Sequence, residues 1–173
     1  MAGKRRSITN ANIYVNGGNF VGTASEVEIP EVDIKKEDHN ALGMIGMTRN
    51  FSGIEMGEMT ISWNSVLDAQ KLAAFINPNE RIQIDVRWSV RIAGSAGIES
   101  EKAGRLTAFG EPNNVPGMTF AQHTNVETQS RIELTAMKMV EDGVTVYDID
   151  IDSNTFKVGG VDIMAKYKQN LGL

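Results

Sequence analysis

One stretch of the sequence alternates between apolar and polar residues without a break from Arg81 to Ile92. Strict alternation indicates a β-strand with one buried face and one solvated face. At about 3.3 Å per residue the strand would span roughly 40 Å, which is longer than most strands. The predicted inward residues are Ile82, Ile84, Val86, Trp88, Val90 and Ile92, and the predicted outward residues are Arg81, Gln83, Asp85, Arg87, Ser89 and Arg91.

The same pattern continues toward the C-terminus. A flexible tip at Gly94-Ser95-Ala96-Gly97 joins the long strand to a second strand around Lys102–Gly110, and a Pro/Gly-containing loop follows. Residues Ser130–Ala136 alternate again, and Asp142-Gly143 is a typical two-residue hairpin turn. The apolar residues of the returning strand change phase at Val146–Tyr147, which predicts a β-bulge there.

The N-terminal part contains a similar hairpin. Ile13 and Val15 lead into the turn Asn16-Gly17-Gly18-Asn19, whose glycines tolerate positive φ. We expect the next strand to run from Phe20 to about Ile29 and to stop before the following proline. Glu58–Trp63 alternates as a further strand. The chain is therefore expected to be mainly β.

Two segments are predicted to be helical. The first runs over residues 65–76, is capped by Asn64 or Ser65, and stops at Asn77-Pro78. Its apolar residues form a single stripe, so one side should pack on a sheet. A shorter helix is predicted between Asp162 and Gln169.

The alternation fails between residues 31 and 57, which we name the arm. A loop of this length is unusual in a compact domain unless it is functional or disordered, and disordered segments contain few apolar residues. We therefore expect a segment that orders against a neighbouring subunit, and a hairpin packed on its own sheet is the alternative. The apolar arm residues proposed to make contacts are Ile34, Leu42, Met44, Ile45, Met47, Phe51 and Ile54.

Composition excludes several functions. The absence of cysteine rules out disulfides and thiolate metal sites. A net charge of −5 disfavours a protein whose main role is to bind DNA phosphates. The sequence contains no nucleophile elbow, phosphate loop or dinucleotide fingerprint. We therefore predict no catalytic residue and no cofactor, and we find no signal peptide or membrane span.

Candidate ligand residues are few. His39 and His123 lack a second histidine or carboxylate at zinc-ligand spacing and are interpreted as solvated. Asp148, Asp150 and Asp152 imitate the start of a calcium loop, but Ser153 stands where that loop needs glycine. We interpret these aspartates as an acidic, solvated strand face, with weak cation binding left open, and predict no metal site.

A family resemblance is carried by segments near both ends of the chain and in the arm, namely Asn12–Gly22, Val27–Pro30, Ala41–Gly46, Tyr147–Asp150, Phe156–Asp162 and Asn170–Leu173. These segments resemble the major tail tube protein of contractile-tailed bacteriophages and the related tubes of R-type pyocins. The middle of the chain matches that family in pattern more than in residues.

The resemblance implies an antiparallel β-sandwich or barrel subunit with one flanking α-helix and a long extended arm, in a single domain of residues 1–173. Six such subunits would form a ring with a closed inner β-barrel, and rings would stack into the tube of a virion tail assembled in the host cytoplasm. The implied partners are other copies, a sheath protein, tail tip or baseplate and terminator proteins, and DNA in transit.

The strand pattern supports a ring on separate grounds, because long strands leave unpaired edges and closure into a ring pairs them. We predict three contacts between subunits: paired strand edges, the arm, and the chain ends. The predicted terminal contact residues are Lys4, Arg5, Arg6, Asn170, Leu171 and Leu173. The alternatives are the tube of a DNA-free pyocin-like particle, or a monomeric β-sandwich binding module, which usually exposes more aromatic residues than the 6% present here.

Overall fold

The computed structural model describes residues 4–65, 67, 69–95 and 97–173. These residues form twelve strands and two helices, and the strand pairs are antiparallel, which confirms the mainly β prediction. The elements are β1 (Arg5–Val15), β2 (Gly18–Asn19), β3 (Ala24–Glu28), β4 (Val32–His39), β5 (Thr48–Met56), β6 (Glu58–Trp63), α1 (Ala69–Ala73), β7 (Ile82–Gly94), β8 (Gly97–Pro112), β9 (Thr128–Glu141), β10 (Val144–Asp150), β11 (Thr155–Val158), β12 (Val161–Asp162) and α2 (Ala165–Leu171).

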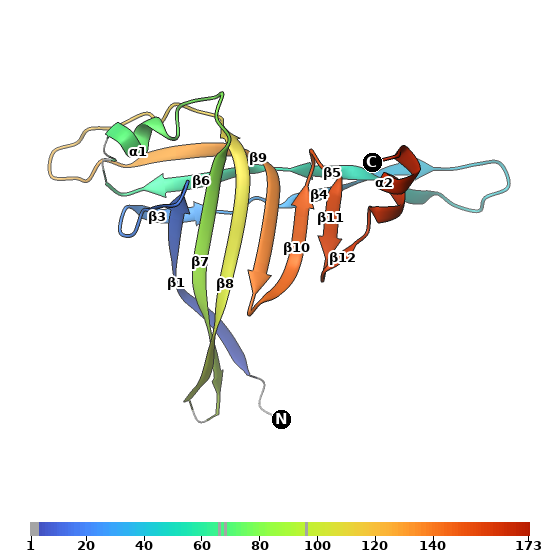
Figure 1. The fold of residues 1–173 in the computed structure, drawn as a ribbon, viewed down its shortest axis with the longest axis horizontal. Helices are drawn as coiled ribbons and strands as arrows, with labels where there is room; N and C mark the ends of the chain where they lie inside the picture. The colour runs from blue at the N-terminus through green and yellow to red at the C-terminus, as the bar shows by residue number, and fades with distance from the viewer. Residues whose placement is uncertain (1–3, 66, 68, 96) are drawn as a thin grey trace.

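One large sheet dominates the fold (Figure 1). Its strands follow the order β12-β11-β10-β9-β8-β7-β1-β2, with β6 attached to β9 and β3 attached to β6. The long strand predicted from the alternation is confirmed as β7. It pairs with β8 from Ile82–Gly110 to Gly94–Gly97, and residue 96 of the predicted tip lies outside the described residues.

The predicted turns and bulge are also present. Asn16 and Gly17 both have positive φ and join β1 to β2 in a two-residue turn, and Asp142 and Gly143 do the same between β9 and β10. These are the conformations that tight hairpins require. The register of β10 on β9 shifts between Thr145 and Tyr147, so the predicted bulge is confirmed.

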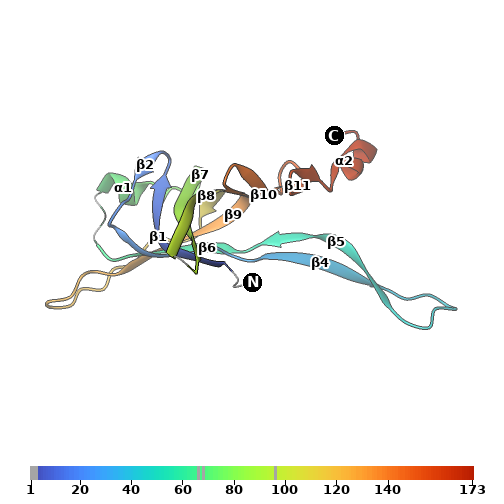
Figure 2. The ribbon, with the colours of Figure 1, turned by 90° about the horizontal axis from the view of Figure 1, so that it is seen from below.

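The hydrophobic core lies where β6 and β3 fold over the apolar face of β1, β7 and β8 (Figure 2). Strand β9 makes this possible because its first half pairs with β6 and its second half pairs with β10. Trp63 is fully buried against Phe20 and Phe75, with ring centroids 5.5 and 5.2 Å away. Its indole nitrogen donates to the hydroxyl of Ser130 at 2.9 Å, which satisfies the polar groups of both.

Three predicted elements differ from the structure. The strand expected over Phe20–Ile29 begins only at Ala24, because Phe20 enters the core and Gly22 adopts a φ of +76° in a turn. Helix α1 is shorter than the helix predicted over residues 65–76, of which residues 66 and 68 lie outside the described part.

The C-terminal helix also starts later than predicted. Asp162 belongs to β12, and its carboxylate accepts a hydrogen bond from the backbone N–H of Met164 at 3.0 Å. Helix α2 therefore begins at Ala165, and it ends at Leu171, where the left-handed backbone of Gly172 caps the last turn.

The arm is a regular two-stranded hairpin rather than an irregular loop. Strands β4 and β5 pair from Val32–Met56 out to His39–Thr48, with a register shift at Lys35–Lys36. The hairpin extends away from the rest of the subunit along the longest axis (Figures 1 and 2). Most of its residues are exposed, so burial imposes no apolar and polar alternation, and the sequence pattern gave no strand signal there.

Candidate assembly surfaces

The face of the large sheet that points away from the core is polar and contains one buried charge. Asp85 was predicted to be solvated, but it is only 5% exposed. Its carboxylate accepts two hydrogen bonds from Arg105, at 2.8 and 3.0 Å, and one each from Thr107 at 2.6 Å and Gln83 at 3.1 Å. Neighbouring long side chains on β7 and β8 therefore cover it and supply its partners.

The pKa of Asp85 reflects this environment. Burial alone would raise the pKa of the carboxyl, and this is the largest single effect. The hydrogen bonds from Thr107, Arg105 and Gln83, together with the charge of Arg105, outweigh it and lower the pKa below its ordinary value. Asp85 is therefore a stable anion that holds β7 and β8 together on this face.

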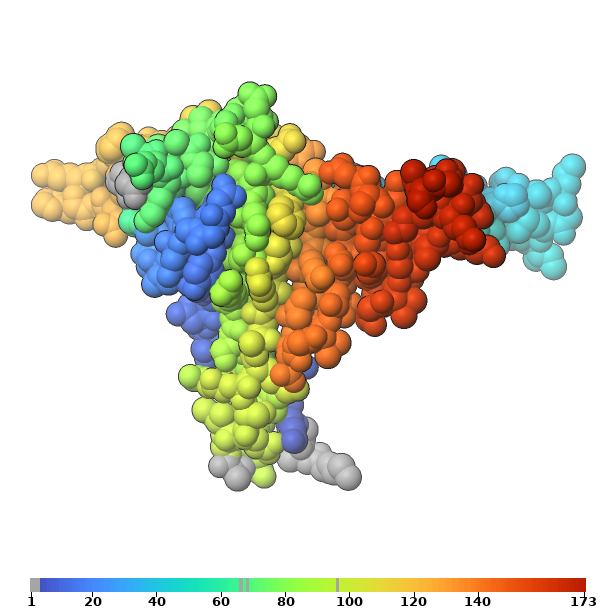
Figure 3. All heavy atoms as spheres, in the orientation of Figure 1, coloured from blue at the N-terminus to red at the C-terminus, as the bar shows by residue number. Residues whose placement is uncertain are grey.

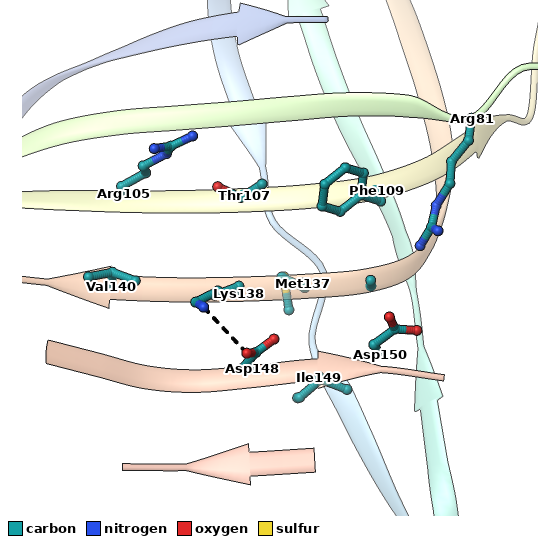
Figure 4. A pocket seen from close by; sticks show the side chains of 11 residues that line it. Arg81, Arg105, Thr107, Phe109, Met137, Lys138, Val140, Asp148, Ile149 and Asp150 are labelled. Atoms are coloured by element: carbon teal, nitrogen blue, oxygen red, sulfur yellow. Dashed lines mark ion pairs between the residues drawn. The ribbon is translucent and has the colours of Figure 1, made fainter. Parts of the chain in front are cut away.

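Further charges on the polar face are paired across strands. Lys138 lies 3.4 Å from the carboxylate of Asp148, as Figure 4 shows, and Arg91 lies 2.8 Å from Glu101. A shallow hollow of about 550 Å³ is lined by side chains that include Arg81, Arg105, Lys138, Asp148 and Asp150. The face is thus a mixed-charge surface, on which the aspartates predicted to be solvated lie beside basic side chains.

The predicted ligand residues do not gather into a site. Asp148 and Asp150 lie on β10, whereas Asp152 lies in the turn that follows. His39 and His123 are both exposed. Within the described part of the chain, no group of three or more histidine, cysteine, aspartate or glutamate side chains is placed to hold a metal ion.

The tip of the arm carries exposed apolar side chains. Leu42 and Ile45 are fully exposed, and Met44 and Met47 are also exposed. Ile54 differs from the other predicted contact residues because it is half-buried and packs against the subunit's own core. The predicted residues that remain available to a neighbour are Ile34, Leu42, Met44, Ile45, Met47 and Phe51.

The start of β1 and helix α2, which are near the two ends of the chain, lie far apart (Figures 1 and 3). Near the N-terminus, Lys4 pairs with Glu99 at 2.8 Å and Arg6 pairs with Glu141, so two of the predicted basic residues have partners within the subunit, whereas Arg5 is exposed. At the other end Leu171 and Leu173 are exposed beside Asn170. The contact of both ends with neighbours stays a prediction.

The large sheet ends in open strand edges. Strand β2 pairs only with Tyr14 and Val15, which leaves the outer edge of β1 from Arg5 to Ile13 without a partner strand in the described structure. On the opposite side β11 and β12 cover only part of β10. Open edges are ready to pair with another chain, and native proteins normally protect them.

The sequence interpretation missed an exposed apolar segment between β8 and β9. Residues 113–127 form a loop without regular secondary structure, and Val115, Met118 and Phe120 within it are exposed. Its first part was described only as a Pro/Gly loop. The length of the segment and its three large apolar residues were a signal of the same kind as the one used for the arm.

Similarity to known proteins identifies the family of the chain. The family described as "Phage tail tube protein FII" matches residues 5–172. The chain belongs to this family. It is also 22% identical to the tail tube protein of Escherichia phage P2 over 173 residues, which covers 97% of this chain and 98% of that protein. The protein is therefore a structural subunit of a phage tail tube and a virion component, not an enzyme.

Two solved structures are more distantly similar. One is the 6-fold symmetrised baseplate of the anti-feeding prophage, with a TM-score of 0.48, 8% identity, and coverage of 75% of this chain and 90% of that chain. The other is an Hcp protein, with a TM-score of 0.45, 13% identity, and coverage of 76% and 92%. Both scores are below 0.5. In the described part of the tail tube protein, no helix is long and apolar enough to cross a membrane.

Proposed function

We propose that six copies of this single-domain subunit close into a ring, and that rings stack into the inner tube of a contractile tail through which DNA passes. The observation that carries the proposal is the large sheet, which has a core on one face, a charge-paired polar face on the other, and open edges at both sides. The number six and the contractile tail come from the sequence resemblance.

Ring closure would pair the open edges of the sheet. The free edge of β1 in one copy would meet the β10–β12 side of the next, so the sheets would continue around the ring as one barrel. The interface is heterologous, since two different edges meet, and such an interface forms a ring when its rotation closes. The polar face would then line the channel.

The ion pairs on that face would let DNA move through the channel without tight binding. Arg105 is paired with Asp85, Lys138 with Asp148, and Arg91 with Glu101, so these cations are neutralised within the subunit. Tight binding of DNA needs unpaired lysine and arginine side chains that replace the counterions of the phosphates. The net charge of −5 acts in the same direction. Sheath, tail tip or baseplate, and terminator proteins are the further proposed partners.

The arm would contact a neighbouring subunit through its exposed tip. We expect Met44→Asp to leave a folded subunit that no longer polymerises, because a charge would have to be buried in the contact. Negative-stain electron microscopy and circular dichroism check this, with Arg49→Lys in the same hairpin as the matched control. Normal tubes from Met44→Asp would contradict the role of the arm.

The ring and tube are tested on the unmodified protein. Negative-stain microscopy should show hollow rings and tubes, and class averages viewed down the axis should show six subunits. A monodisperse monomer at high concentration would contradict the proposal and favour a monomeric binding module.

A further inference from the structure

The loop of residues 113–127, which we name the β8–β9 loop, is firmly held at its base. The backbone N–H of Asn113 donates to the carbonyl of Arg131 at 2.8 Å. The side chain of Asn114 donates to the carbonyl of Gln129 at 2.9 Å and accepts from the N–H of Arg131 at 2.7 Å. Strand β9 thus fixes the position of the loop although the loop has no regular structure of its own.

The outer part of the loop is uncharged and carries exposed apolar side chains. From Pro112 to Val126 the sequence contains no lysine, arginine, aspartate or glutamate. Phe120 is 79% exposed, and Val115 and Met118 are also exposed. Monomeric proteins rarely expose a large aromatic side chain on an uncharged loop that is fixed at its base. Such a side chain is typical of a residue that anchors an interface.

An apolar groove lies on the other side of the molecule. It holds about 440 Å³ between the base of the arm and the C-terminal segment. Its aromatic and aliphatic lining comes from β5, from β11 and the turn before it, and from α2. Asp150 is the charged residue among those that line it. The apolar lining residues are Phe51, Ile54, Ile151, Phe156, Met164 and Tyr167.

The loop and the groove cannot meet within one subunit. Figures 1 and 2 show the β8–β9 loop at one end of the longest axis, while the arm and α2 lie toward the other end. A ring built from a repeated heterologous contact needs two different complementary surfaces on opposite sides of each copy. An uncharged protrusion with exposed apolar side chains and a mainly apolar groove meet this requirement.

We propose that the β8–β9 loop of one copy inserts Phe120 into the groove of a second copy of this chain. The inference rests on the proposed ring, because it names the residues of one contact in that ring. The partner is another copy because the chain belongs to a tail tube family, and because the contact runs alongside the strand edges that ring closure would pair. Burial of Phe120 removes a large apolar area from water and stabilises the ring.

Cysteine cross-linking tests the contact directly because the natural chain has no cysteine. Because Phe120→Cys also removes the anchor, a variant with Phe120→Cys and Tyr167→Cys is assembled at a raised subunit concentration, oxidised and run on a non-reducing gel. A disulfide requires Cα atoms within about 7 Å, so it can form only between copies here. We expect a ladder of covalent oligomers, whereas each single variant should give no ladder. The matched control pairs Phe120→Cys with Ile98→Cys, an exposed position outside the groove.

A substitution series gives an independent readout. Phe120→Asp should raise the subunit concentration needed for assembly by at least about tenfold, because an anchor is lost and a charge is buried. Its circular dichroism should match that of the natural protein, since the side chain is exposed in the subunit. Phe120→Leu should largely retain assembly, and Gln122→Asp in the same loop is the control for added charge.

The outcomes separate this contact from the tube itself. Normal tubes from Phe120→Asp, or tubes that give no ladder with the 120 and 167 pair, would overturn the contact and leave the proposed function standing. A ladder from the 98 and 120 pair in place of the 120 and 167 pair would also overturn it. Natural protein that stays monomeric would overturn both.

Discussion

Replacing Asp85 by asparagine is expected to destabilise the subunit by about 2–3 kcal/mol. The change keeps the size of the side chain but removes the charge that accepts hydrogen bonds from Arg105, Thr107 and Gln83. Breaking a fully buried ion pair typically costs roughly 3–5 kcal/mol. The Arg105 side chain is 47% exposed and stays partly hydrated, which places the loss below that range. For a chain of this length the melting temperature should fall by roughly 5–10 °C.

The pH dependence of this contribution has a definite sign. The pKa of Asp85 is lower in the folded subunit than its ordinary value of about 3.9. The anion therefore stabilises the fold above pH ~4, and the contribution is lost as the pH falls through the lower folded pKa. The difference in stability between the natural protein and Asp85→Asn should shrink in that acidic range.

Thermal unfolding of dilute subunits, followed by circular dichroism at several pH values, measures both effects. A double-mutant cycle with Arg105→Met isolates the interaction of the pair, and Ser89→Ala on the same face of β7 is the matched control. A loss below about 0.5 kcal/mol at pH 7, or a coupling energy near zero, would refute the assignment of Asp85 as a stabilising anion.

Two further changes test the packing of the subunit. Gly110→Ala should destabilise by at least about 2 kcal/mol, because the new Cβ would lie 2.2 Å from the backbone carbonyl oxygen of Glu133. Gly117→Ala, with no atom within 4 Å of its Cβ, should be nearly neutral, and equal urea midpoints for the two would contradict this reasoning. Trp63→Phe should cost about 1–3 kcal/mol, because it leaves the Ser130 hydroxyl without its donor and opens a cavity. A melting temperature unchanged from that of the natural protein would show that the core relaxes around the gap.

The sequence predicted the fold best where one face of a strand is buried. The alternation in β7 and the glycine turns at Asn16-Gly17 and Asp142-Gly143 report local geometry directly, so the structure matches them. The arm has no buried face along most of its length, and its strands left no periodic trace. Helix α1 is shorter than its apolar stripe suggested, since tertiary packing rather than propensity decides where short helices end.

The candidate surfaces were predictable only in part. The exposed apolar residues in the arm were found because the arm is long and rich in apolar residues but lacks the alternation of a half-buried strand. The burial of Asp85 depends on side chains from β8 that pair with it across the sheet, and nothing in the local sequence of β7 reveals them. The groove is built by β5 together with β11 and α2, which lie far from β5 in the sequence, so the local sequence does not reveal it.

The path of the chain from the arm into the core also has a mechanical consequence. Strand β5 ends at Met56 and β6 begins at Glu58, and the two run along nearly one line in Figure 1. A pull on the arm would therefore load β6 lengthwise, at right angles to its hydrogen bonds with β9 and β3. Bonds loaded in shear must yield together, whereas bonds at the end of a peeled strand yield one at a time. The subunit therefore resists a force along the arm better than a force that peels β6 off β9 and β3.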